Sequence, residues 1–283
     1  MVVAMNYRAY IAVFAFFWMV FAGSVEIAHS EEKKKMALLI GNADYPFAAL
    51  RNPVNDAGDL SSRLKSIGFD TTMLANPGYE QFKSAIMSFY RAVSEDPETL
   101  SVFYYAGHAT QMNNVNYLIP VDSKISDQKT LVKESININE LLLAMAQTSN
   151  QKNLVILDAC RNNPFKKVST EDQSRGIELP DEAIRNLQQG LAPIEAPAGT
   201  IIAYATAPGN VAKDGKGRNG MYTKYLLKHL DKHRPVEEIF KLVRKDVVKA
   251  SRGKQIPWEH SSLYKTVYFY APRNEDIPEI GGF

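Results

Sequence analysis

Short apolar runs alternate with amphipathic segments from residue 36 onward. Apolar runs typical of strands buried on both faces of a sheet occur at residues 36–40, 99–105, 153–157 and 200–205. Further strand-like segments lie at residues 69–74, 117–121 and 266–270. Apolar side chains recur at helical spacing in residues 54–67, 82–93, 136–146, 222–230 and 236–250. This alternation predicts an α/β fold, with a mostly parallel central sheet and helices on both faces.

The first 30 residues have the organisation of an export signal. Arg8 precedes an uncharged apolar run at residues 11–22, and the small residues Ala28 and Ser30 fit cleavage after Ser30. The apolar run is shorter than the about 20 residues that a membrane-spanning helix needs. We therefore expect a cleaved signal peptide, with an uncleaved N-terminal anchor as the alternative. Both interpretations place the body outside the cytoplasm, in the periplasm or in the medium.

Composition excludes several classes of protein. The chain of 283 residues carries 33 Lys and Arg against 31 Asp and Glu, and a net charge of +2 fits neither a strongly basic nucleic-acid binder nor an acidic disordered chain. Apolar residues make up 45% of the chain, which is enough for a sizeable core. The single cysteine excludes an intramolecular disulfide, a cysteine-rich zinc site and a CxxC redox motif.

Two residues with catalytic chemistry come just after buried strands. His108 follows the run at residues 99–105, and Cys160 follows the run at residues 153–157. The carboxyl ends of parallel strands meet at one edge of a sheet, where α/β proteins place their sites. An imidazole beside a thiol increases its nucleophilic fraction and can protonate a leaving amine. The backbone N–H groups of Ala109 and Cys160 are candidate donors to the oxyanion. Because each residue alone is more often structural, the prediction depends on their joint placement.

The residues around this pair resemble a known family. Residues 104–108 (YYAGH) and 158–162 (DACRN) are similar to the His and Cys motifs of the caspase-like cysteine peptidases, in particular the metacaspase, paracaspase and bacterial branch. His108 lies 52 residues before Cys160, and the caspase pattern has about 50. Further similar segments are residues 38–42 (LLIGN), 52–57 (NPVNDA), 116–122 (NYLIPVD), 204–209 (YATAPG) and 257–263. The resemblance covers residues 36–271.

This resemblance implies a three-layer caspase-like fold in one peptidase domain over residues 31–283. A large-subunit-like part would span residues 36–165 and a small-subunit-like part residues 199–271. The linker between them, residues 166–198, can be cut in the family during maturation. A peptidase specific for basic residues could cut itself there after Lys166, Lys167, Arg175 or Arg185.

The resemblance also implies a catalytic dyad of His108 and Cys160 and a substrate class. Family members that cut after Asp carry Gln in the motif before the nucleophile, whereas this chain carries Asp158 there. A carboxylate at the floor of the pocket would pair with a guanidinium or ammonium group, so cleavage after Arg or Lys is expected. Asp56 and Asp214 match two more acidic pocket residues of the paracaspase-like pattern.

One departure from the family leaves alternatives open. Gly usually follows the catalytic His in the family, but this chain has Ala109, and Ala resists a positive φ. An alternative function is therefore a catalytically weak caspase-like scaffold that binds basic peptides. A further alternative is an unrelated α/β hydrolase or binding domain with a similar placement of Cys and His.

Cofactors and partners follow from the same interpretation. We expect no metal site and no cofactor. The sequence contains no EF-hand loop, but its scattered carboxylates leave calcium dependence open. The expected partners are proteins or peptides with Arg or Lys at the cleavage site. Nucleic acid is not expected, and a membrane is expected only if the N-terminal segment is retained.

Overall fold

The computed structural model describes residues 34–160, 187–188, 191–207 and 217–270. These residues belong to one compact unit, Lys33–Phe283. The expected export segment, Asp214 and the four basic residues of the linker lie outside the described residues. Of Cys160, only the backbone is described.

The centre of this unit is a mostly parallel β-sheet. Its parallel strands lie in the order β2 (Asp70–Ala75), β1 (Lys35–Gly41), β3 (Leu100–Met112), β6 (Asn153–Cys160) and β8 (Thr200–Tyr204). Strand β9 (Trp258–Ser261) is antiparallel to β8 at one edge. The predicted α/β fold with a mostly parallel sheet is therefore confirmed.

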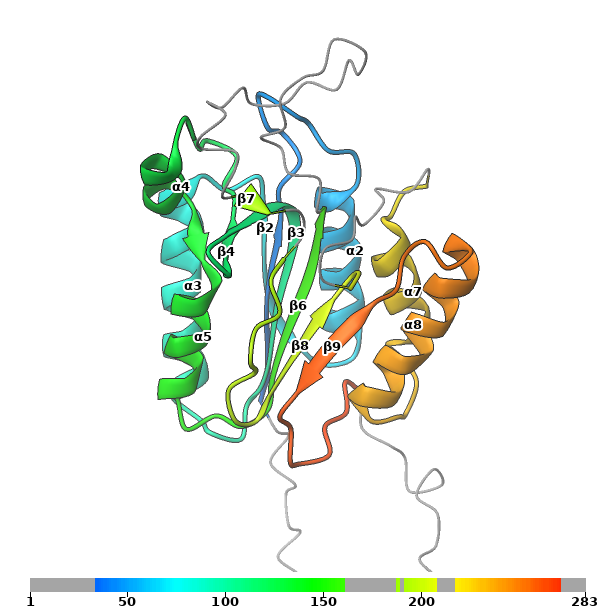
Figure 1. The fold of residues 1–283 in the computed structure, drawn as a ribbon. Helices are drawn as coiled ribbons and strands as arrows, with labels where there is room; N and C mark the ends of the chain where they lie inside the picture. Colours follow the sequence, from blue (N-terminus) through cyan, green and yellow to red (C-terminus); the bar gives the residue numbers. More distant parts are fainter. Residues whose placement is uncertain (1–33, 161–186, 189–190, 208–216, 271–283) are drawn as a thin grey trace, which may run out of the picture. The chain divides into compact units, whose positions relative to one another are not determined.

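Helices cover both faces of the sheet. One face packs against α2 (Pro53–Ser66), α7 (Met221–His229) and α8 (Val236–Ser251), and the other against α3 (Tyr79–Ser94) and α5 (Ile138–Gln147) (Figure 1). Successive strand residues face opposite layers, so that Leu39 and Tyr104 lie in one core and Leu38 and Phe103 in the other. Burial on both faces explains why these strands read as continuous apolar runs.

Strand β3 is longer than the sequence predicts. The apolar run predicts an end near residue 105, but the strand continues through His108 to Met112 and folds back into β4 (Val115–Leu118). The turn residues Asn113 and Asn114 have φ angles of 52° and 62°, as a two-residue hairpin turn requires and as Asn tolerates. Polar residues of the extension, such as Thr110, are buried. The hydrophobic pattern therefore ends before the strand does.

The prediction of a last strand at residues 266–270 is wrong. The closing strand is β9, and in residues 266–270 only Tyr268 forms an isolated bridge, with Pro235. Val267 and Phe269 are buried in the core beside α8. Their alternating burial produces a strand-like pattern in a segment that docks on the core without joining the sheet.

Two short elements before α5 also differ from the expectation. The expected helix over residues 136–146 begins at Ile138, where Asn137 caps it, because residues 136–137 form strand β5 (Ile136–Asn137) against β4. The hydrophobic pattern does not predict helix α4 (Gln128–Glu134). Leu131 is its one buried residue, so a helical hydrophobic period is missing, and the capping box of Asp127 and Thr130 marks its start.

The last part of the predicted linker packs against strands β3 and β4. Strand β7 (Leu187–Gln188) pairs with β3. Leu191 and Ala192 are buried, and the Ala192 N–H donates to Asn116 Oδ1 at 2.7 Å while Asn116 Nδ2 donates to the Ala192 carbonyl at 2.9 Å. The C-terminal end of the linker is therefore held in place by buried hydrogen bonds.

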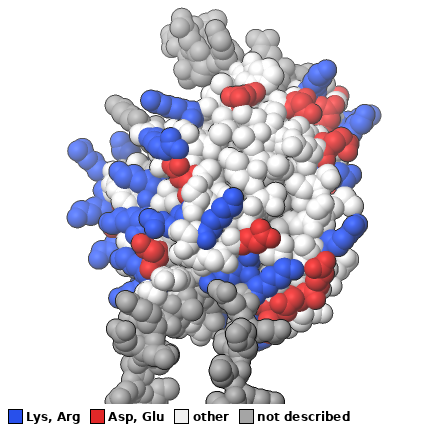
Figure 2. All heavy atoms as spheres, turned by 180° about the vertical axis from the view of Figure 1, so that it is seen from behind, with Lys and Arg blue, Asp and Glu red and all other residues white. Residues whose placement is uncertain are grey.

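Positive charge gathers on the outer helical layer of one face. Exposed lysines on α7 and α8 are Lys224, Lys228, Lys241, Lys245 and Lys249. In Figure 2, Lys and Arg side chains gather along the left edge, which is the side of α7 and α8. Among the helices that the structure describes, none has the length and apolar character needed to cross a bilayer.

Candidate active site

His108 and Cys160 lie opposite each other on neighbouring strands. The parallel register of β3 and β6 pairs His108 with Cys160, two positions after the pair of Ala106 and Asp158. The His108 side chain is buried, with 4% of its surface exposed. The register thus brings the two predicted catalytic residues to adjacent positions at one end of the sheet, and their catalytic roles stay a prediction.

The hydrogen bonds of His108 assign its tautomer. Its Nε2 lies 2.7 Å from the carbonyl oxygen of Ala48. Because a carbonyl only accepts, the proton is assigned to Nε2, and Nδ1 carries the lone pair. Nδ1 is buried and has no hydrogen-bond partner among the described residues. Burial lowers the pKa of His108 below its ordinary value, although the hydrogen bond to Ala48 opposes this shift. A neutral imidazole whose Nδ1 lone pair accepts from none of the described residues is suited to act as a base.

Aromatic residues hold the backbone and the ring of His108. The hydroxyl of Tyr45 accepts from the His108 N–H at 3.0 Å, and the hydroxyl of Tyr105 donates to the His108 carbonyl at 2.6 Å. The rings of Tyr45 and Phe47 lie 4.5 Å and 5.9 Å from the imidazole, centroid to centroid. A Cβ on Gly107 would lie 2.6 Å and 2.7 Å from the two tyrosine hydroxyls. This position before His108 therefore requires glycine.

Ala109 follows His108 in an ordinary strand conformation. It pairs with Leu118 in the β3–β4 ladder. Among the described residues, positive φ at non-glycine positions occurs at Asn76, Asn113, Asn114 and Arg252, and not at Ala109. The methyl group of Ala109 therefore causes no backbone strain at this position. The roles of the Ala109 and Cys160 N–H groups as oxyanion donors stay predictions.

Two of the three predicted pocket aspartates converge beside the start of α7. Asp56, in the first turn of α2, is 3% exposed and accepts the Gly220 N–H at 2.9 Å and 3.2 Å with its two oxygens. Asp158, near the end of β6, accepts from the Thr223 hydroxyl at 2.7 Å. A Cβ on Gly220 would lie 3.0 Å from Asp56 Oδ2 and 3.6 Å from Asp158 Oδ2. Both carboxylates therefore reach the same point. Asp214 lies outside the described residues.

The surroundings of the two carboxylates are poorly solvated. Thr223 also shares a hydrogen bond of 2.7 Å with the hydroxyl of Tyr104. Burial raises the pKa of Tyr104 well above its ordinary value, and the charges of Asp158 and Asp56 raise it further. Burial also raises the pKa of Tyr222 well above its ordinary value, and the charge of Asp158 raises it further. Because water screens these charges weakly, a cationic group entering this region would be strongly favoured.

Three groups that contact the site residues could not be predicted from the sequence. They are the Ala48 carbonyl, the Gly220 N–H and the Thr223 hydroxyl, and no motif marks them. They reach their partners only through the fold, since Ala48 and His108 are 60 residues apart and Thr223 and Asp158 are 65 apart. In the described part of the chain, no three His, Cys, Asp or Glu residues are grouped so as to hold a metal ion.

Comparison with known proteins identifies the family. A family model described as "Caspase domain" matches residues 34–268. The human mucosa-associated lymphoid tissue lymphoma translocation protein 1 and its mouse homologue are each 24% identical to this chain over 237 residues, which is 82% of this chain and 26% of each relative. The chain thus spans about a quarter of the length of these relatives.

Solved structures show the same fold. A crystal structure of caspase-1 from Spodoptera frugiperda has a TM-score of 0.58 at 17% identity and covers 86% of this chain and 92% of its own. The structure of pro-sf-caspase-1 has the same TM-score of 0.58 at 16% identity, with coverage of 85% and 92%. Since the family match extends over most of the described residues, the chain belongs to the caspase-domain family of cysteine-type peptidases.

Proposed function

We propose that the chain is an exported cysteine endopeptidase that cleaves peptide bonds after Arg or Lys through an acyl-enzyme on Cys160. The observation that carries the specificity is the convergence of Asp56 and Asp158 beside Gly220. Two carboxylates, of which Asp56 is buried and Asp158 is partly exposed, favour a guanidinium or ammonium group and disfavour an acidic side chain. The proposed substrates are therefore proteins or peptides with a basic residue before the cleaved bond.

The proposed mechanism uses the Nδ1 lone pair of His108, which has no hydrogen-bond partner among the described residues. Nδ1 takes the proton of the Cys160 thiol, and the thiolate attacks the scissile carbonyl. The N–H groups of Ala109 and Cys160 stabilise the oxyanion, and the His108 imidazolium then protonates the leaving amine. Water, deprotonated by His108, hydrolyses the thioester, which releases the carboxylate product and restores the thiol. This cycle needs no cofactor.

The specificity test compares matched fluorogenic peptides that end in Arg, Lys or Asp, assayed with the full chain, with and without calcium. We expect release from the Arg and Lys peptides and none from the Asp peptide. The Cys160→Ala variant should abolish release. Loss of one charge-assisted contact costs about 1.5–3 kcal/mol, so Asp158→Asn should lower kcat/KM for the Arg peptide by roughly tenfold or more.

Two outcomes of this test would count against the proposal. Equal release from the Arg and Asp peptides would contradict the specificity. No release by folded protein that still binds the Arg peptide would favour the scaffold that binds basic peptides. Release that occurs only with calcium would show that activity depends on this ion, and the proposed preference for Arg and Lys would stay the same.

Export is tested separately, because it depends on the N-terminal segment alone. Expression in a bacterium, cell fractionation and the intact mass of the product distinguish the two forms. A periplasmic product that begins after Ser30 supports a signal peptide, and a full-length product in the membrane fraction supports an anchor. A full-length product in the cytosol would contradict export.

A further inference from the structure

The segment that leads into α7 is attached to α2 by an exposed ion pair. Arg218 donates from Nε and Nη2 to Asp59 Oδ2 and Oδ1, each at 2.8 Å. Asn219 Nδ2 donates to Asp59 Oδ2 at 2.9 Å, and Asn55 Nδ2 donates to the Arg218 carbonyl at 3.3 Å. This two-pronged arrangement fixes the orientation of the guanidinium as well as its position.

The same segment continues directly to the two aspartates of the proposed substrate pocket, Asp56 and Asp158. Two residues after Arg218, the Gly220 N–H binds Asp56, which is one helical turn before Asp59 on α2. Three residues further, the hydroxyl of Thr223 binds Asp158. The ion pair of Asp59 and Arg218 therefore holds the piece of backbone that presents two hydrogen-bond donors to the pocket carboxylates.

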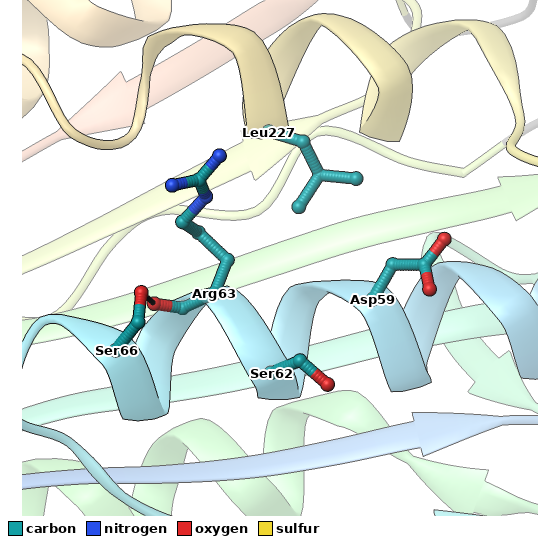
Figure 3. A pocket seen from close by; sticks show the side chains of 5 residues that line it. All are labelled: Asp59, Ser62, Arg63, Ser66 and Leu227. Carbon is teal, nitrogen blue, oxygen red and sulfur yellow. Dashed lines mark hydrogen bonds between the residues drawn. The ribbon is translucent and has the colours of Figure 1, made fainter.

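A second ion pair, one helical turn further along α2, links this helix to the residues that follow α7. Asp59 and Arg63 lie on the side of α2 that faces α7, with Leu227 of α7 beside them (Figure 3). Asp59, Arg63 and Leu227 line a groove of about 400 Å³ together with Ser62 and Ser66. Asp231 follows the end of α7, and its Oδ2 lies 3.7 Å from Arg63 Nη1. Of these two ion pairs, the pair of Asp59 and Arg218 adjoins the segment that contacts the pocket carboxylates.

We propose that Asp59 and Arg218 are positioning residues for substrate specificity. They hold the entry of α7 so that the Gly220 N–H and the Thr223 hydroxyl orient Asp56 and Asp158 toward the basic side chain of the substrate. The inference rests on the proposed preference for Arg and Lys. Because the Arg218 side chain is 67% exposed, the ion pair contributes little to overall stability, and variants should fold.

The test measures kcat and KM of the full chain with the Arg peptide for Asp59→Asn and Arg218→Gln. Each variant should raise KM by about three- to tenfold with kcat within about twofold, because each loosens the same contact. A purely long-range charge effect predicts opposite signs, since removing the positive charge of Arg218 would lower KM for a cationic substrate. The double variant should be no worse than either single variant.

Three further variants complete the design. Asp231→Asn breaks the other ion pair between α2 and α7 and should leave KM unchanged. Arg218→Lys keeps the charge but loses the two-pronged geometry, so KM should rise less than in Arg218→Gln. On the Cys160→Ala background, Asp59→Asn and Arg218→Gln should weaken binding of the uncleaved Arg peptide by the same factor. This last measurement does not need turnover.

The outcomes separate this inference from the proposed function. A wild-type chain that prefers Arg, together with unchanged KM in both variants, overturns the positioning role alone. A lower KM in Arg218→Gln, or an equal rise in Asp231→Asn, also overturns it. A wild-type chain that neither prefers nor binds the Arg peptide over the Asp peptide overturns the proposed specificity, and the positioning role with it.

Discussion

Burial favours the neutral form of the His108 imidazole. Burial lowers its pKa below the ordinary value of 6.5, against the opposing hydrogen bond to Ala48. The neutral base should therefore persist to mildly acidic pH. We expect the acid limb of kcat/KM for the Arg peptide to lie below pH 6.5, as measured by a pH–rate profile. An acid limb above pH 6.5 would contradict this assignment.

The lowered pKa of His108 also makes the free energy of unfolding depend on pH. In the window between the lowered folded pKa of His108 and the ordinary 6.5, the unfolded chain binds a proton that the folded chain does not. The contribution of neutral His108 is thus fully present above pH 6.5 and decreases as the pH falls through that window. Denaturant unfolding across this range should show a shallower pH dependence for His108→Gln. Identical slopes for the two proteins would contradict the linkage.

Thr223 connects a buried tyrosine to a pocket carboxylate. Replacing it by valine keeps the shape but removes the donor to Asp158 and the partner of the Tyr104 hydroxyl. A hydrogen bond to a charged group contributes about 1.5 kcal/mol or more, so Thr223→Val should lower kcat/KM for the Arg peptide by roughly tenfold. Thr223→Ser retains the hydroxyl and should stay close to wild type. A valine variant with unchanged kcat/KM would show that Asp158 needs no such donor.

Among the elements, those with a strong hydrophobic period are predictable from the sequence. Helices α2, α3, α7 and α8 each bury one face, so their period marks them. The extension of β3 and helix α4 have no such period, because one buries polar residues and the other buries little. Residues 266–270 alternate in burial like a strand but lie outside the sheet. The hydrophobic pattern cannot distinguish these two cases.

The candidate site also combines residues that the sequence reveals with groups that only the fold reveals. His108, Cys160, Asp56 and Asp158 are visible in the sequence because of their side-chain chemistry and because they lie just after apolar runs or in motifs. The groups that orient them are backbone atoms and a threonine from distant parts of the chain. Such contacts depend on tertiary packing, and no local pattern encodes them.

The β3–β4 hairpin supports the backbone of His108 through its register. Its turn residue Asn114 has a φ of 62°, and beyond β4 the Ile119 N–H donates to the His108 carbonyl at 3.0 Å. A β-branched residue in this left-handed conformation costs about 1–2 kcal/mol. Asn114→Val should therefore lower the midpoint of thermal unfolding by about 2–8 °C. Asn114→Gly serves as the control and should be at least as stable as wild type; a valine variant as stable as wild type would contradict the turn assignment.

For the whole molecule, the linker joins two strands that are direct neighbours. Residues 153–157 of β6 pair in parallel with residues 200–204 of β8. The apolar residues of both strands lie in the shared cores of the sheet. A cut before β7, where the four basic residues lie, would leave this pairing and the residues of both cores in place, so we expect chain cleavage without unfolding.

Self-cleavage in the linker follows from the proposed specificity. We expect the active full chain, on prolonged incubation, to be cut after one or more of Lys166, Lys167, Arg175 and Arg185, as read from fragment masses. The fragments should separate on a denaturing gel but elute together in size exclusion, because β6 and β8 stay paired. The Cys160→Ala variant should remain intact when incubated alone, and adding active wild-type chain to it distinguishes cutting between molecules from cutting within one. A single unchanged band from chain that cleaves the Arg peptide would show that the linker is not a substrate, and fragments that elute apart would show that the β6–β8 pairing does not hold the two parts together.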